Sequence, residues 1–189
     1  ALPPFEMGVK AGAATVMSAF NDISGVPASA NRYTMTDILR GMWGFDGLVV
    51  SDWDAVKQLV AQGVAADRAE AAAKAITAGL DMDMVDDVYR ENLEALVESG
   101  RVPEKVLDEA VRRILRVKFR LGLFEKPYIE ELPDEQRYLS IEARAAAREL
   151  AAESMVLLKN SGATLPVAGD VRRIALMGPM ADNRADLMG

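Results

Sequence analysis

The chain has 189 residues, of which 50% are hydrophobic and 27% charged, an ordinary globular balance that excludes a disordered or collagen-like polymer. The formal net charge is −7, and the basic residues are spread rather than pooled, which argues against a nucleic-acid surface. Cysteine and histidine are absent, so disulfides, thiolate or histidine metal sites, Ser-His-Asp triads and Cys-His pairs are excluded, and acid–base chemistry falls to carboxylates.

Strands alternate with helices in the first part of the chain. Short apolar, partly β-branched runs predict buried strands over 14–19 and 48–52, and an apolar and acidic run predicts a third over 80–84. A polar loop over 21–31 follows the first strand. Apolar residues at helical spacing predict helices over 32–43, 54–62 and 67–78. This alternation predicts an α/β fold with a parallel sheet, and the short apolar strands favour part of a (β/α) barrel over an open sheet.

The later part of the chain begins with two further helices, predicted over 87–99 and 103–121. Residues 123–139 combine proline and charge without periodicity, which is typical of a linker. A helix over 140–155 and a buried strand over 174–178 then indicate a second domain that begins near residue 140. Both ends of the chain are expected to be cuts through a longer protein. No apolar run approaches the roughly 18–20 residues that span a bilayer, and no signal peptide is visible.

The densest candidate site is the end of the second predicted strand, at Asp52 and Trp53. A carboxylate there can attack the anomeric carbon of a sugar, and the indole offers an apolar face to the sugar ring. Spacing alone favours a plainer role in which Asp52 caps the helix that follows. Asp54 is a better geometric match for that cap, which leaves the chemical role of Asp52 open.

Other acids and amides follow the predicted strands. If the strands form one barrel, Asn21, Asp52 and Asp81 fall at the same mouth, where barrel enzymes hold their chemistry. Asp81 and Asp83 could pair as carboxylates or bind a divalent cation. The favoured alternative is a polar loop edge with both acids in water.

Several stretches in collinear order, covering nearly the whole chain, resemble glycoside hydrolase family 3, and within it the bacterial, often periplasmic, β-glucosidases. The stretches are Val16-Met-Ser-Ala-Phe-Asn21, Gly25-Val-Pro-Ala28, Ile38-Leu-Arg-Gly-Met-Trp-Gly-Phe-Asp-Gly47, Leu48-Val-Val-Ser-Asp-Trp53, Ala78-Gly-Leu-Asp-Met82, Arg113-Ile-Leu-Arg-Val-Lys-Phe-Arg-Leu-Gly-Leu-Phe124, Glu153-Ser-Met-Val-Leu-Leu-Lys-Asn160, Thr164-Leu-Pro166 and the run from Ile174 to Asp182.

The resemblance implies a domain plan. Residues 1–122 would be the C-terminal portion of a (β/α)8-like barrel, which is the catalytic domain. Residues 123–139 would be the linker, and 140–189 the truncated beginning of an α/β sandwich domain.

The resemblance also implies roles for four residues. Asp52 matches the family's nucleophile, Trp53 the aromatic residue of the sugar site, and Met17 a methionine near the bound sugar. Many members have tyrosine where this chain has Phe20, and that tyrosine can hydrogen-bond the nucleophile. Phe20 cannot make this bond, but it suits a wall of the sugar site.

The implied activity is that of a retaining, exo-acting β-glucosidase, which removes terminal non-reducing β-D-glucosyl residues by double displacement without metal or cofactor. The family's acid/base Glu and several sugar-gripping residues fall outside this chain, so activity needs the rest of the protein. The implied partners are a β-glucoside or short oligosaccharide and the remaining segments of the same enzyme, in the periplasm or outside the cell. A homodimer stays open, and neither nucleic acid nor a membrane is expected as a partner.

Three alternatives remain beside this hypothesis. A β-xylosidase is a close variant. A β-N-acetylglucosaminidase of the same family is another, although those enzymes are often single-domain, and the linker and second domain argue against it. The third is a catalytically silent fragment of a nicked enzyme, with only a structural role.

Overall fold

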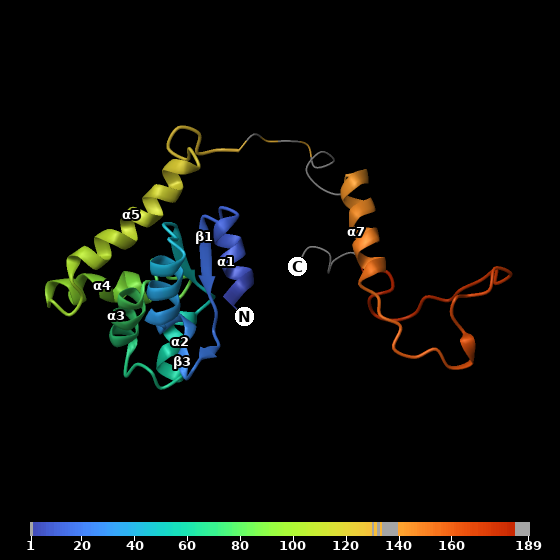
Figure 1. The fold of residues 1–189 in the computed structure, drawn as a ribbon, viewed down its shortest axis with the longest axis horizontal. Helices are drawn as coiled ribbons and strands as arrows, with labels where there is room; N and C mark the ends of the chain where they lie inside the picture. Colours follow the sequence, from blue (N-terminus) through green and yellow to red (C-terminus); the bar gives the residue numbers. More distant parts are fainter. Residues whose placement is uncertain (1, 130, 132, 134–139, 184–189) are drawn as a thin grey trace. The chain divides into compact units, whose positions relative to one another are not determined.

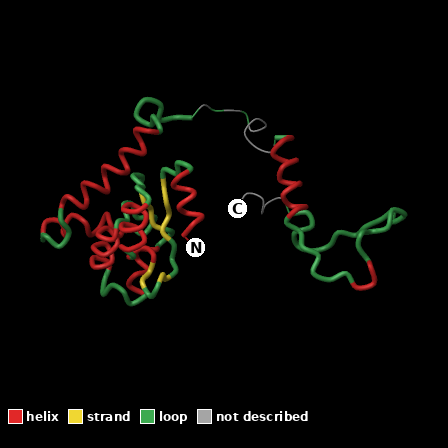
Figure 2. The backbone as a smooth tube through the Cα atoms, in the orientation of Figure 1, coloured by secondary structure: helices red, strands yellow, loops and turns green. Residues whose placement is uncertain are grey.

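The computed structural model describes residues 2–129, 131, 133 and 140–183, and the chain divides into two units, Ala1–Ile129 and Glu130–Gly189 (Figure 1). All strands that the described residues form lie in the first unit (Figure 2).

Two parallel strands form the main sheet of the first unit: β1 (Thr15–Ser18) and β4 (Leu48–Ser51). Met17 of β1 lies opposite Val50 of β4. Met82 extends the pair by a parallel bridge to Val50, and the Ser51 amide donates to the Met82 carbonyl at 2.9 Å. The strands predicted over 14–19 and 48–52 are therefore confirmed at shorter lengths. The strand predicted over 80–84 contributes only this bridge.

A small antiparallel hairpin follows β1, within the stretch that was predicted to be only a loop: β2 (Asp22–Ile23) and β3 (Val26–Pro27). Ser24 and Gly25 form its two-residue turn, and both have positive φ, 54° and 80°. Such turns match the twist of the paired strands, so even very short strands can pair across them.

The first unit has these helices: α1 (Leu2–Lys10), η1 (Ala28–Ala30), η2 (Tyr33–Met42), α2 (Ala55–Ala61), α3 (Arg68–Ala78), α4 (Val88–Glu98) and α5 (Glu104–Arg120). Each predicted helix is found close to its predicted range, and α1 is an addition. Helix η2 is of the π type, with the Trp43 amide donating to the Ile38 carbonyl at 3.0 Å.

Local signals explain where two of these helices begin and end. The Asp67 carboxylate accepts the Glu70 amide at 2.7 Å and caps α3, as the sequence indicates, and Gly79, with φ 109°, ends that helix. The buried Asn31 side chain accepts the Thr34 amide at 3.1 Å at the start of η2. The α3 helix is therefore held at both ends, and its alanine-rich face packs closely on α2 and α4.

The core lies between the helices and one face of the sheet. Val49 and Ser51 of β4 are buried on that face. Side chains alternate along a strand, so Met17, Val50 and Met82 form a row on the opposite face, where Met17 and Met82 are exposed. The α/β class is confirmed, and the first strand is buried on one face only.

The second unit contains α7 (Ile141–Glu153) and the short helix η3 (Ser161–Ala163). The Ser140 hydroxyl accepts the Ala143 amide at 3.1 Å and caps α7, so the predicted helix over 140–155 is confirmed. The predicted strand over 174–178 is not formed: no strand occurs among residues 140–183. A strand needs a hydrogen-bonded neighbour, and the described residues of this unit supply none. Part of the linker predicted over 123–139 lies outside the described residues.

Candidate active site

Asp52 lies directly after β4, at the carboxyl end of the sheet. Its amide donates to the Ser18 carbonyl at 3.1 Å, which extends the pairing of β1 and β4 by one residue. Alternation along the strand then assigns the Asp52 side chain to the face that carries Met17 and Val50. The carboxylate accepts the Trp53 amide at 2.7 Å, and the residue remains partly exposed. A carboxylate that is fixed on one oxygen and reachable by solvent is suited to attack an electrophilic carbon.

The three residues expected to line a sugar site are all exposed near this carboxylate. Trp53 is 60% exposed, Met17 51% and Phe20 40%. The carbonyl of Phe20 accepts the Gln62 side chain at 3.0 Å, which ties the segment after β1 to the end of α2. The ends of β1 and β4 therefore bring apolar surface and a carboxylate together, as sugar recognition requires.

The helix-cap interpretation of this site is wrong. Asp54 occupies the capping position of α2, but its φ is 56° and its carboxylate makes no capping bond. It pairs instead with the Lys57 ammonium at 3.7 Å. The cap comes from Asp86, whose carboxylate accepts the Lys57 amide at 2.8 Å. The Asp52 carboxylate is thus not used as a helix cap.

Asp81 does not lie at the same mouth as Asp52, which corrects the expectation from the strand pattern. Its side chain is 1% exposed and accepts the Val49 amide at 2.8 Å, beside the beginning of β4. Arg40 and Arg113 donate to its two oxygens at 2.5 and 2.8 Å. The alternative of a solvated acid is equally wrong for Asp81, which is a buried ionic anchor.

Asp83 does not pair with Asp81. It is hydrogen-bonded to Asp86, and burial together with Asp86 raises the pKa of Asp83 to about 7. No group of three or more metal-ligating side chains that could hold an ion occurs among the described residues.

Ser51 is a member of the site that sequence reasoning did not single out. Its fully buried hydroxyl donates to the Asp52 carbonyl at 2.9 Å and accepts the Met84 amide at 2.8 Å. Its place directly before the acid in the Ser-Asp-Trp motif was the available signal. Ser51 therefore links the Asp52 backbone to Met84, in the segment that follows the bridge at Met82.

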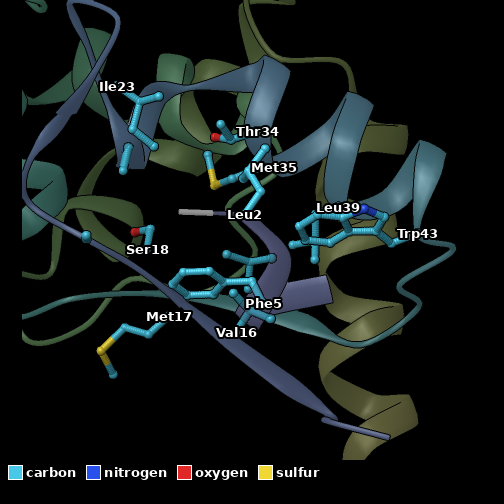
Figure 3. A pocket seen from close by; sticks show the side chains of 13 residues that line it. Leu2, Phe5, Val16, Met17, Ser18, Ile23, Thr34, Met35, Leu39 and Trp43 are labelled. Atoms are coloured by element: carbon cyan, nitrogen blue, oxygen red, sulfur yellow. The ribbon is translucent and has the colours of Figure 1, made fainter. Parts of the chain in front are cut away.

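An apolar pocket of about 140 Å³ lies on the helix-covered face of β1. Its walls come from α1, β1 and η2, and they include Phe5, Val16, Met35, Leu39 and Trp43. Met17 borders the pocket, but its side chain points away from it (Figure 3). No carboxylate lines the pocket, so it does not provide the chemistry expected of the sugar site.

Residues 1–117 match the glycosyl hydrolase family 3 N terminal domain. The chain belongs to this family. The Ser-Asp-Trp segment and the residues around it all lie within the matched range.

Individual relatives agree with the family. The chain is 42% identical over its whole length to a periplasmic β-glucosidase of Salmonella typhimurium, of which it covers 25%. It is 37% identical over 95% of its length to a β-xylosidase of Formosa agariphila, of which it covers 26%. A crystal structure of a β-glucosidase from Listeria innocua in complex with glucose matches 88% of this chain with 42% identity and a TM-score of 0.79, and the match covers 23% of that chain.

This family 3 chain therefore spans about a quarter of the length of the relatives it matches. None of the helices among its described residues has the length and apolar character needed to cross a membrane.

Proposed function

We propose that the protein carrying this chain is a retaining, exo-acting β-glucosidase and that Asp52 is its nucleophile. The observation that carries the proposal is a partly exposed carboxylate at the end of a parallel strand, beside the exposed Trp53, in a family 3 chain. The glucose complex of the Listeria innocua relative and the name of the Salmonella typhimurium relative support a β-glucoside as substrate.

In the proposed mechanism, an Asp52 carboxylate oxygen forms a bond to the anomeric carbon while the bond to the leaving-group oxygen breaks. A general acid from outside this chain protonates that oxygen. Water then attacks the anomeric carbon, its proton passes to the same outside group, and Asp52 leaves, so that two inversions give net retention. Trp53, Met17 and Phe20 form apolar walls for the sugar ring.

The proposal includes the setting of this site. Residues 1–122 belong to a (β/α)8-like barrel, 123–139 to a linker, and 140–189 to an α/β sandwich domain. The remaining segments of the protein complete the sugar site and supply the acid. The name of the periplasmic relative supports a location in the periplasm or outside the cell.

A β-xylosidase is the second candidate, because the Formosa agariphila relative bears that name. The two differ by the hydroxymethyl group of glucose. A site built for glucose is expected to discriminate against xylose by at least about tenfold, since a methylene contact alone contributes about 1–3 kcal/mol.

The experiment compares 4-nitrophenyl β-D-glucoside, β-D-xyloside and N-acetyl-β-D-glucosaminide as substrates of the full-length protein. The glucoside should have the highest kcat/KM, and proton NMR of the first product should show β-glucose before mutarotation. α-Glucose as the first product, or preference for either other sugar, would contradict the proposal. The 189-residue chain alone should be inactive, because it contains neither the proposed acid nor the other proposed barrel strands.

A further inference from the structure

One short segment, Asp83–Asp86, holds the turn that carries Asp52 from both sides. The Met84 amide donates to the Ser51 hydroxyl at 2.8 Å, and the Met84 carbonyl accepts the Asp54 amide at 3.4 Å. The Asp86 carboxylate accepts the Lys57 amide, which fixes the first turn of α2. The position of the Asp52 backbone therefore depends on this segment as well as on its own strand.

Backbone conformation indicates that these contacts are needed. Asp54 and Val85 have φ angles of 56° and 76°. Positive φ is unfavourable for side chains with a Cβ, most of all for a β-branched valine. Such conformations persist only where the surroundings enforce them, and they concentrate at functional sites. The turn and the segment that braces it would thus relax if their mutual contacts were lost.

A single buried carboxylate joins the beginnings of two helices. One oxygen of Asp86 accepts the Lys57 amide of α2 at 2.8 Å, and the other accepts the Val88 amide of α4 at 3.2 Å. The Asp86 carbonyl accepts the Arg68 guanidinium at 2.6 Å. Asp86 therefore holds the beginnings of α2 and α4 together and also binds α3 through Arg68.

Asp83 is a second carboxyl group in this segment, and it pairs with Asp86. One of its oxygens accepts the Tyr89 amide at 3.2 Å, and the other is buried and receives no hydrogen bond from an amide, a hydroxyl or a cation of the described residues. Its side chain is hydrogen-bonded to Asp86, and two carboxyl groups can share a hydrogen bond only when one of them holds a proton. Burial, first, and Asp86, second, raise the pKa of Asp83 from 3.8 to about 7. The shared proton is therefore carried by Asp83 below neutral pH.

The other charged groups around the pair have partners of their own. Arg68 of α3 pairs with Glu91 of α4 at 2.8 Å, and Lys57 of α2 pairs with Asp54. The Tyr89 hydroxyl donates to a backbone carbonyl, and burial raises its pKa, so it stays neutral. Two further acids form ion pairs: Asp81 with Arg40 and Arg113, and Asp87 with Arg90. Among the described residues, no ion pair involves Asp83. A proton is therefore the group that allows the Asp83 and Asp86 carboxyl groups to lie in contact.

We propose that Asp83 and Asp86 are positioning residues for the nucleophile, a carboxyl pair that shares one proton and holds the turn carrying Asp52. This proposal rests on the proposed role of Asp52. Loss of the proton leaves two carboxylates in contact, whose repulsion weakens the bond between Asp86 and the Lys57 amide. The turn then loosens, so kcat falls while KM changes little.

The direction of the pH effect follows from the pKa of Asp83. The folded pKa lies above the ordinary value of 3.8, so the stabilisation is complete below that value and is lost as pH rises through about 7. The turn that carries Asp52 is therefore expected to loosen as pH rises above about 7 and to remain held at lower pH.

The test measures hydrogen–deuterium exchange of the peptide that spans α2 in the full-length protein between pH 6 and pH 8, corrected for the intrinsic exchange rate. In the wild-type protein, protection at Lys57 should fall by about tenfold over this range, since Asp83 becomes about 90% ionised one unit above its pKa. Asp83→Asn keeps the shape and can donate to Asp86 at every pH, so protection should stay constant. Asp87→Asn, next to the pair and exposed, is the matched control and should behave as wild type.

Kinetics add a second readout. Asp83→Asn should raise the ratio of kcat at pH 8 to kcat at pH 6 by several-fold relative to wild type, with KM unchanged. Wild-type protection at Lys57 that does not fall above pH 7, or an identical fall in Asp83→Asn, would overturn the carboxyl pair. Absence of hydrolysis by the full-length protein at every pH would overturn the proposed function instead, because exchange at Lys57 needs no substrate.

Discussion

Asp52→Asn should lower kcat of the full-length protein for a β-glucoside by at least about a thousandfold, which corresponds to about 4 kcal/mol of lost transition-state stabilisation. The amide lacks the charge needed to attack the anomeric carbon, yet its oxygen can still accept the Trp53 amide, so the turn keeps its shape. KM should change far less than kcat, because the lost bond forms only during the reaction. Steady-state kinetics with an aryl glucoside measure both parameters.

The matched control for this change is Asp54→Asn, two residues away. Among the described residues, the Asp54 carboxylate forms an ion pair only with the exposed Lys57 ammonium, at 3.7 Å, and asparagine tolerates the positive φ of this position. The control should retain kcat within about threefold, a change of less than 1 kcal/mol. A large loss in Asp54→Asn together with a small loss in Asp52→Asn would reverse the proposed roles of the two acids.

Asp81→Ala should lower the free energy of unfolding by about 3–5 kcal/mol, because it leaves a buried guanidinium without its counter-charge. Burial already lowers the pKa of Arg40, and Asp81 is the largest opposing influence. The same carboxylate also binds the Val49 amide and Arg113 of α5, so its loss releases β4 and α5 together. Urea unfolding followed by circular dichroism measures the change.

Glu109→Gln provides the comparison for a surface ion pair. Glu109 pairs with Arg112 on the exposed face of α5, and such pairs contribute about 0–1 kcal/mol. A loss below about 1 kcal/mol for Asp81→Ala, equal to that of Glu109→Gln, would show that Asp81 is not a structural anchor.

The strand that precedes Asp52 was predictable because it begins with a short, uninterrupted apolar run, Leu48-Val-Val50, that enters the core. The position of Asp81 was not, although the same alternation governs it. Asp81 lies beside Val49, earlier in the strand register than Asp52, and therefore points toward the helices and away from the mouth. The sequence shows that an acid lies near a strand. The side of the sheet to which the acid's side chain points depends on the register between the strands.

The cap of α2 shows a second limit. Local spacing indicates Asp54 as the capping residue, but the Lys57 amide is bound by Asp86, which lies 29 residues further along the chain. A contact of this kind exists only after the sheet has brought the two segments together. Helix α1 escaped prediction for a local reason: Pro3 and Pro4 suggest a break, yet proline is tolerated in the first turn of a helix.

The proposed mechanism requires Asp52 to form a covalent bond to the sugar. Treatment of the full-length protein with 2-deoxy-2-fluoro-β-D-glucosyl fluoride should trap this glycosyl-enzyme. The fluorine at C2 slows both displacements, whereas the reactive fluoride leaving group speeds the first, so the intermediate accumulates. Digestion and tandem mass spectrometry should then find the label on Asp52, within the peptide that contains Ser51 and Trp53. Label on Asp54 or Asp81 instead, or turnover without any covalent label, would contradict the claim.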